Sequence, residues 1–272
     1  MNYSIENVSK DFSVGRRSAP VLDGVSLTVA AGEHLSVLGS SGAGKTTLFR
    51  LLNATLRPTR GAIRVDGCDC GVMSSAELRG ARRRIGTIYQ QHNLVPSLTS
   101  LQNTLCGCLG RWSMAQTVRS IFQPARLDVQ EALHALELVG LADKRLARAD
   151  ELSGGQQQRL AIARVLMQKP EVILADEPIA SLDRALADEI ISLLVRVGTE
   201  GQRTLIVALH KVELALEHFP RVIGLGEGRM RFDLPANTVH EDVLRDLYGK
   251  HTTEAGQPQN GERFQREFGC SR

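Results

Sequence analysis

The stretch "GSSGAGKTT" at Gly39–Thr47 decides how the rest of the chain is interpreted. A run so rich in glycine and hydroxyl side chains, with one lysine, favours neither a helix nor a strand. It follows the apolar run "LSVL" and precedes "TTLFRLLN", whose leucines share one helical face. In this strand–loop–helix context, G-x-x-x-x-G-K-[ST] curls its backbone N–H groups around a phosphate at a helix N-terminus. We therefore predict a loop that holds a nucleoside triphosphate, rather than a flexible glycine–serine turn.

The motif also assigns side chains within this phosphate-binding loop (P-loop). Lys45 is expected to reach the β- and γ-phosphates, and Thr46 offers its hydroxyl to Mg²⁺. The residues expected to bind the nucleotide here are Gly39, Ser40, Ser41, Gly42, Ala43, Gly44, Lys45, Thr46 and Thr47.

A second motif, "VILADEP", places two carboxylates at the end of an apolar run. Asp176, at the carboxyl edge of the expected strand, is where a P-loop protein holds Mg²⁺, usually through water. Glu177 is turned to the other side and can accept a proton from, or orient, a water that attacks the γ-phosphate. Two adjacent acidic residues are more often surface decoration, but the strand before them in a P-loop chain favours a catalytic pair.

The third motif is "LSGGQQQR", which opens the helical run "LAIARVLMQ". Ser153 can cap this helix, and a capped helix without further function is the plain alternative. Two glycines disfavour a helix start but allow a backbone to approach a phosphate closely. The chain thus contains two phosphate-binding devices. One ATP can contact both the P-loop and "LSGGQQQR" only if the two motifs face each other. A second subunit could supply the second motif.

The remaining hydrophobic pattern predicts an α/β fold. "IENVSKDF", Val25–Glu33 and Ala62–Gly67 are expected to form a small antiparallel sheet. The runs "HLSVLG", "VILAD", "TLIVAL" and "RVIGLG" are apolar on both faces, as in a buried parallel sheet. Amphipathic helices are predicted at Val129–Lys144 and Leu182–Val197, with a mostly helical insertion over roughly 91–165. The polar tail after about 250 is expected to be loosely ordered.

Composition excludes several classes of protein. The chain has 272 residues, a net charge of +3 and only 4% aromatic residues. It therefore lacks the aromatic side chains on which the bases of a single-stranded nucleic acid would stack. The N-terminus does not read as a signal peptide, and no stretch approaches the roughly 18 apolar residues of a membrane span. We therefore expect a chain that is soluble by itself.

The basic run "RGARRR" (79–84) is expected to be a solvated loop or helix end, and a contact to acidic lipid or a partner is the lesser alternative. The five cysteines are expected to be free thiols.

Together, "GSSGAGKT", "LSGGQQQR", "VILADEP", "ASLD" (Ala180–Asp183) and His210 in "ALHK" resemble the ABC-type ATPases over about residues 3–249. The resemblance implies a RecA-like P-loop ATPase core with an N-terminal antiparallel β subdomain and an inserted helical subdomain. The core lobe would span about 1–90 and 166–235, the helical subdomain that carries the signature about 91–165, and the tail 251–272. It also implies head-to-tail homodimers. In them the signature residues Ser153, Gly154, Gly155 and Gln156 of one chain face the phosphate held by Lys45 of the other, and Asp183 crosses the interface.

The same resemblance assigns three further residues. Gln90 in "TIYQQHNL" is similar to the Q-loop glutamine, which touches Mg²⁺ or its water and senses a transmembrane partner; Gln91 is the weaker choice. Phe12 in "SKDF" matches the aromatic that stacks on adenine, with a core or hairpin aromatic as the alternative. His210 matches the switch histidine that contacts the γ-phosphate, although a lone histidine is usually a surface residue.

Within this family the chain resembles the ATP-binding subunits of phosphonate importers, through "GTIYQQHNLVPSLTSLQNTLCGCLG", "ALELVGLADK" and the closing "EDVLRDLYG". This implies an ATPase on the cytoplasmic face of the inner membrane, docked on permease subunits. A substrate-binding protein would deliver the cargo to these permease subunits. The cargo would be phosphonate or a related phosphorus oxyanion. Two alternatives remain: a non-transport single-cassette ABC ATPase, such as a partner of the carbon–phosphorus lyase complex, and a P-loop small-molecule kinase, which the signature disfavours.

Overall fold

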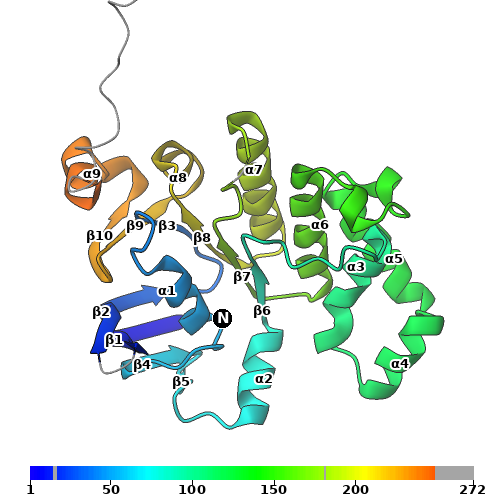
Figure 1. Ribbon diagram of the computed structural model, residues 1–272, viewed down its shortest axis with the longest axis horizontal. Helices are drawn as coiled ribbons and strands as arrows, with labels where there is room; N and C mark the ends of the chain where they lie inside the picture. The colour runs from blue at the N-terminus through cyan, green and yellow to red at the C-terminus, as the bar shows by residue number, and fades with distance from the viewer. Residues whose placement is uncertain (15–16, 181, 249–272) are drawn as a thin grey trace, which may run out of the picture.

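A six-stranded, mostly parallel sheet forms the centre of the protein in our computed structural model, which describes residues 1–14, 17–180 and 182–248 (Figure 1). Its strand order is β10-β9-β3-β8-β7-β6, and only β10 runs antiparallel to its neighbour. The strands are β3 His34–Leu38, β6 Ile85–Ile88, β7 Val172–Asp176, β8 Thr204–Leu209, β9 Arg221–Gly226 and β10 Arg229–Pro235. The loops that leave β3, β8 and β7 therefore lie side by side at one edge of the sheet.

A second, antiparallel sheet covers one side of this centre. It has the order β2-β1-β4-β5, with β1 Tyr3–Val14, β2 Arg17–Val29, β4 Arg60–Val65 and β5 Cys68–Asp69. Helix α1 (Lys45–Leu52) packs with both sheets, because its apolar side chains share one buried cluster with residues of β1 and β7. The Tyr3 hydroxyl also donates to the Leu52 carbonyl at the end of α1, at 3.2 Å.

The helical part of the chain lies between β6 and β7. It consists of α3 Ser100–Leu105, η1 Cys106–Gly110, α4 Met114–Phe122, α5 Arg126–Leu138, η2 Ala142–Lys144, η3 Ala149–Glu151 and α6 Gly154–Met167. Before it stands α2 (Ser75–Arg83), and after it come α7 Arg184–Glu200, α8 Val212–His218, η4 Ala236–Thr238 and α9 Glu241–Tyr248. Figure 1 shows α3 to α6 gathered on the side of the sheet remote from β1 and β2.

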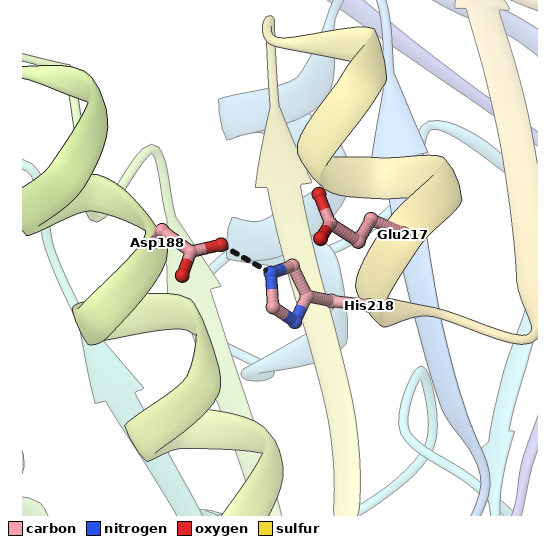
Figure 2. Close-up of side chains that lie close together, drawn as sticks. All are labelled: Asp188, Glu217 and His218. Atoms are coloured by element: carbon pink, nitrogen blue, oxygen red, sulfur yellow. Dashed lines mark hydrogen bonds and ion pairs between the residues drawn. The ribbon is translucent and has the colours of Figure 1, made fainter.

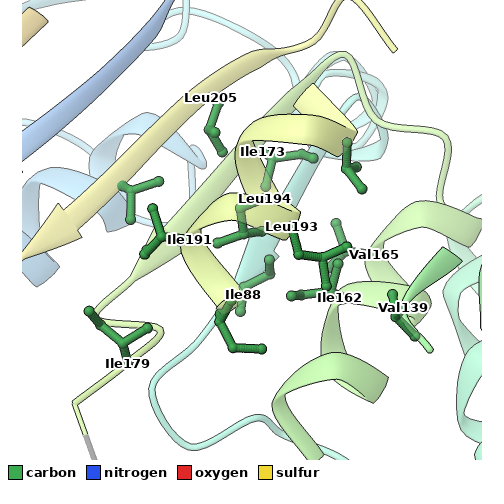
Figure 3. Packing of buried hydrophobic residues seen from close by; sticks show 14 of the residues in the cluster. Ile88, Val139, Ile162, Val165, Ile173, Ile179, Ile191, Leu193, Leu194 and Leu205 are labelled. Carbon is green, nitrogen blue, oxygen red and sulfur yellow. The ribbon is translucent and has the colours of Figure 1, made fainter. Parts of the chain in front are cut away.

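The strands of the parallel sheet are buried on both faces. In β7, Val172 and Leu174 join the cluster with α1, whereas Ile173 and Ala175 join a second cluster with α6 and α7. Figure 3 shows this second cluster, in which Ile162 of α6 and Leu194 of α7 are fully buried. Burial on both faces explains why these strands are continuous apolar runs in the sequence.

The predicted fold class and the named strands of both sheets are confirmed, with differences at element ends. Strands β6 and β10 were not predicted, because β6 is only four residues long and β10 alternates between exposed and half-buried side chains. Helix α7 begins later than expected because the side chain of Asp183 accepts the Leu186 N–H at 3.0 Å and caps it. Helix α5 ends at Leu138 rather than Lys144, because Gly140 takes a left-handed φ of 71° just beyond it.

Other expectations of the sequence concern the surface. The basic run forms the end of α2, as predicted, and Arg84 just beyond it pairs with Glu171 at 2.6 Å. Cys68, Cys70, Cys106 and Cys108 are free thiols, whereas Cys270 and the tail after residue 250 lie outside the described residues. None of the helices in the described part of the chain combines the length and hydropathy needed to cross a bilayer.

Candidate functional site

The P-loop runs from the end of β3 to the start of α1. Gly44 caps α1 with a left-handed φ of 103°, and no side chain accepts the first N–H groups of this helix. A Cβ at Gly39 would lie 2.3 Å from the Leu225 carbonyl oxygen, so only glycine fits there. The free N–H groups at the N-terminus of α1 form a cradle suited to an anion.

Lys45 lies at the centre of the site, buried under the P-loop. Its ammonium donates to the carbonyls of Gly39 at 2.7 Å and Ser40 at 3.0 Å, and lies 3.3 Å from Oε1 of Glu177. Nδ1 of His210 is 3.5 Å away. The ammonium thus bridges the loops after β3, β7 and β8.

Glu177 and His210 are paired directly. Nε2 of His210 lies 2.7 Å from Oε2 of Glu177, and a neutral imidazole protonated on Nε2 satisfies both this contact and that with Lys45. Glu177 has a left-handed φ of 51°, and its side chain faces Lys45 and His210. Left-handed backbone at a residue with a side chain is strained, and such residues cluster at functional sites.

Asp176 is the last residue of β7 and is 8% exposed. Its Oδ1 has no hydrogen-bond partner in the described part of the chain. Burial raises the pKa of Asp176, and the hydroxyl of Thr46 acts in the opposite direction. A buried acceptor without a partner, beside an exposed hydroxyl, is the kind of hard oxygen pair that suits Mg²⁺.

Gln90 and Phe12 border this site from two sides. Gln90 is exposed and follows β6, whose Ile88 pairs with Ala175 of β7, so Gln90 and Asp176 leave the same edge of the sheet. Phe12 is 38% exposed, with the Lys10 ammonium 5.4 Å from its ring centroid, so it is not a core residue. It pairs with Ala19 in the hairpin whose second strand touches the P-loop near Gly44.

The signature is not part of this cluster. Ser153 caps α6, accepting from the N–H of Gln156 at 3.4 Å, while the Gln156 side chain accepts the Ser153 N–H at 3.0 Å. Gly154 faces open space, whereas Gly155 packs against Leu186. Figure 1 shows α6 separated from α1 by β6 and β7. The structure therefore brings Lys45, Thr46, Asp176, Glu177 and His210 together, but leaves the signature and Asp183 outside within one chain.

Helices α7 and α8 link Asp183 to His210. Nε2 of His218 at the end of α8 lies 2.8 Å from Oδ1 of Asp188 on α7, as Figure 2 shows. Lys211, next to His210, donates to the Leu182 carbonyl at 3.3 Å. These two contacts fix the loop of His210 against the segment that precedes α7.

Sequence reasoning missed three residues near the site. Lys211, whose contact to Leu182 is given above, and Arg164, which holds the loop of Gln90, lie inside motifs that assign them no role of their own. Tyr248 of α9 interacts with the backbone of Gly39, which opposes the rise in the pKa of Tyr248 caused by burial. The signal for Tyr248 in the sequence is the closing "EDVLRDLYG", which carries the resemblance to the phosphonate-importer subunits but does not point to the P-loop.

Comparison with known proteins agrees with this geometry. The profile of the family described as "ABC transporter" matches residues 22–180. The chain is 45% identical over 236 residues to the "Phosphonates import ATP-binding protein PhnC 2" of Cupriavidus metallidurans, covering 86% of this chain and 83% of that protein. It is 43% identical over 237 residues to the PhnC protein of Pseudomonas fluorescens, covering 87% and 89% of the two chains.

Among solved structures, the chain is similar to the ATP-binding cassette MJ0796, a dimer in a post-hydrolysis state bound to ADP and Pi. The TM-score is 0.73 at 32% identity, covering 86% of this chain and 98% of that one. The RecA-like P-loop ATPase core expected from the sequence is thereby confirmed. On its P-loop, its signature and these relatives, the chain belongs to the ABC transporter family, as one of the ATP-binding proteins of that family.

Proposed function

We propose that this chain is the ATP-hydrolysing subunit of an importer for phosphonates or a related phosphorus oxyanion. It works as a homodimer on the cytoplasmic face of the inner membrane, bound to permease subunits that receive cargo from a substrate-binding protein. The names of its relatives, at 39–45% identity, support the cargo class. The observation that carries the proposal is the contact of Lys45 with both Glu177 and His210.

The proposed roles follow from this cluster. The P-loop N–H groups and Lys45 bind the phosphates, and Phe12 stacks on the adenine. Thr46, Asp176 and Gln90 hold Mg²⁺, directly or through water. When bound, this ion neutralises charge on the phosphates.

Hydrolysis requires that Glu177 exchange its partners. Its two oxygens face Lys45 and His210. Phosphate oxygens compete for the Lys45 ammonium, and His210 turns its imidazole to the γ-phosphate. Glu177 is then free to accept a proton from the attacking water.

The second half of each site comes from the other subunit. Ser153, Gly154, Gly155 and Gln156 of the helical subdomain (91–165) close over the γ-phosphate held by the partner's P-loop, and Asp183 crosses beside them. The dimeric state of MJ0796 supports this arrangement.

A groove beside Gln90 is the proposed seat of the permease. It has a volume of about 760 Å³ and lies between α2, the end of β6, η1 and α6. The exposed apolar side chains of Tyr89, Val95 and Leu109 line it, together with Arg79 and Arg164. Apolar and basic groups together fit an amphipathic permease segment with an acidic residue.

The test is affinity purification of the tagged chain from solubilised membranes, followed by reconstitution of what copurifies into vesicles. We expect a permease to copurify, and ATP-dependent uptake of labelled phosphonate that is lost in Glu177→Gln. Copurification with soluble enzymes of carbon–phosphorus bond cleavage instead, without a permease, would contradict the transport function.

A further inference from the structure

The loop that carries Gln90 contains two adjacent strained residues. His92 has a φ of 54° and Asn93 a φ of 51°, both left-handed. Within the loop, the N–H of His92 donates to the Tyr89 carbonyl at 3.0 Å and that of Asn93 to the Gln91 carbonyl at 2.5 Å. Consecutive left-handed residues with side chains persist only where their surroundings hold them.

Arg164 of α6 provides that hold. Its Nη2 donates to the carbonyl of His92 at 2.8 Å, and its Nη1 to that of Asn93 at 2.5 Å. The rigid guanidinium fork matches two successive carbonyls, which a lysine could not grip in the same way. Burial lowers the pKa of Arg164, and the groups that oppose this are the Cys106 thiol and the Tyr89 phenol, not a carboxylate. The half-buried charge of Arg164 is therefore directed at the loop backbone.

A second contact between α6 and the same loop, that of Gln158 with His92, lacks well-formed hydrogen bonds. The side chain of Gln158 is fully buried, yet neither of its amide atoms has a hydrogen-bond partner in the described part of the chain, and neither has Nδ1 of His92. The Gln158 amide nevertheless lies close enough to His92 to oppose the fall in its pKa that burial causes. Buried polar groups without a well-formed partner are rare, so this contact between Gln158 and His92 is a loose one that leaves the turn dependent on Arg164.

Helix α6 thus connects three features. Its N-terminus is the signature cap at Ser153, and Arg164 in its last turn both holds the loop of Gln90 and lines the groove that also contains Tyr89. We propose that Arg164 is a positioning residue for Gln90, which holds the His92–Asn93 turn in its strained form. A partner segment with an acidic residue in the groove competes for Arg164 and frees the turn. The inference rests on the proposed function and names how its partner regulates the site.

The first test is the steady-state ATPase of Arg164→Ala in the full chain. We expect kcat to fall by about tenfold or more, as when a catalytic group is misplaced, while KM for ATP changes by less than about twofold. Arg164→Lys should recover part of kcat. An unchanged kcat in a folded Arg164→Ala protein overturns the proposal.

The second test is rescue by removing the strain. His92→Gly and Asn93→Gly, introduced together into Arg164→Ala, should restore much of kcat, because glycine adopts a left-handed φ without penalty. The matched control is Gln202→Gly, which removes the same kind of strain (φ 48°) at an exposed turn before β8. Equal rescue by Gln202→Gly, or no rescue by the loop glycines, contradicts a positioning role.

Hydrogen exchange separates this inference from the proposed function, because it needs no nucleotide. Amides of residues 89–95 should exchange about tenfold to a hundredfold faster in Arg164→Ala than in the wild type, from the loss of two charge-assisted hydrogen bonds. Unchanged exchange overturns the clamp even if the wild type hydrolyses ATP. Faster exchange in a chain whose wild type lacks ATPase activity supports the clamp and overturns the proposed function.

Discussion

At the scale of single residues, the site is organised by competition for one ammonium. Lys45 has three N–H donors and four neighbouring acceptors: two P-loop carbonyls, Glu177 and His210. Its side chain is 3% exposed, so water does not satisfy it. Entry of an anion therefore redistributes the contacts of Glu177 and His210 as well. In this way nucleotide binding prepares the carboxylate for chemistry.

The clearest residue-scale prediction concerns Glu177. Glu177→Gln removes the proton acceptor but keeps the size of the side chain, so hydrolysis should slow by roughly 10²–10⁴-fold. Binding of Mg-ATP should persist and an ATP-bound dimer should accumulate, as measured by calorimetry and size-exclusion chromatography. Glu241→Gln, at an exposed position on α9, is the control. Near-normal ATP turnover in Glu177→Gln would contradict the assignment of Glu177 as the proton acceptor.

Asp176 gives a pH-dependent prediction. Burial, with a smaller effect from Glu177, raises the pKa of Asp176 above its ordinary value. A raised pKa means that the unfolded chain binds fewer protons in this range, so the nucleotide-free fold loses stability as pH rises through it. Asp176→Asn should therefore unfold at a higher temperature than the wild type at pH 8, and the two should converge in acid.

The measurement is thermal unfolding of both proteins from pH 4.5 to 8, without and with Mg-ATP. Mg-ATP should raise the midpoint of the wild type more than that of Asp176→Asn, because the variant loses a metal ligand. A difference between the two nucleotide-free proteins that grows on acidification would have the wrong sign for this explanation.

At the scale of elements, the N-terminus of α6 is complete without a ligand. The Ser153–Gln156 capping box satisfies two of its end groups, a device whose serine is typically worth about 1 kcal/mol. Gly155 packs against Leu186: a Cβ there would lie 2.5 Å from Cδ2 of this half-buried side chain, which would have to shift. Gly154 has no neighbour within 4 Å, so the fold of one chain gives no reason for it.

We therefore predict that Gly154→Ala separates folding from activity. Its unfolding midpoint should equal or exceed that of the wild type, because alanine is the better helix former. Its ATPase activity should fall by at least about tenfold, because the methyl group blocks close approach of the partner's nucleotide. Gly80→Ala in α2, which also faces open space, is the matched control and should keep its activity. Full activity in Gly154→Ala would mean that nothing approaches this glycine.

At the scale of the whole molecule, one chain cannot close its own site. The P-loop follows β3, whereas the signature begins α6 beyond β6 and β7 (Figure 1). Helix α6 is anchored there by the apolar cluster it shares with α7 and by the Arg164 contacts to the Gln90 loop. A second copy, related head to tail, is the simplest way to bring the two devices together.

Mixing two inactive variants tests this arrangement. Lys45→Ala damages the P-loop and Ser153→Arg the signature, so each homodimer should be inactive. In a head-to-tail heterodimer both defects fall on one composite site, and the other site is intact, so ATPase activity should reappear in the mixture. A signature acting within its own chain predicts no recovery, because every site then has one defect.

Coupling between the two sites could silence the intact one, so a disulfide provides the control. Ser41 and Ser153 are replaced by cysteine after the native cysteines are removed, and ATP is added. A covalent link between two chains supports the head-to-tail dimer, and a link within one chain refutes it.

The sequence by itself determined everything that depends on local chemistry. The P-loop, the carboxylates that end β7 and the cap of α6 were identified by residue type and spacing, because each acts through its own backbone segment. The buried strands were recognised from apolar runs, since a strand covered on both faces needs such a run wherever it is placed. Short or half-exposed strands such as β6 and β10 lack that signal, because their pairing comes from neighbours elsewhere in the chain.

Only the tertiary structure decided which of these pieces meet. Lys45, Glu177 and His210 are remote in sequence and touch because β3, β8 and β7 are neighbours in the sheet. The hold of Arg164 on the Gln90 loop exists because α6 packs beside β6, and no local pattern encodes that contact. Sheet order and helix packing are set by burial summed over the whole chain, so the partners of a polar side chain are known only after the core has formed.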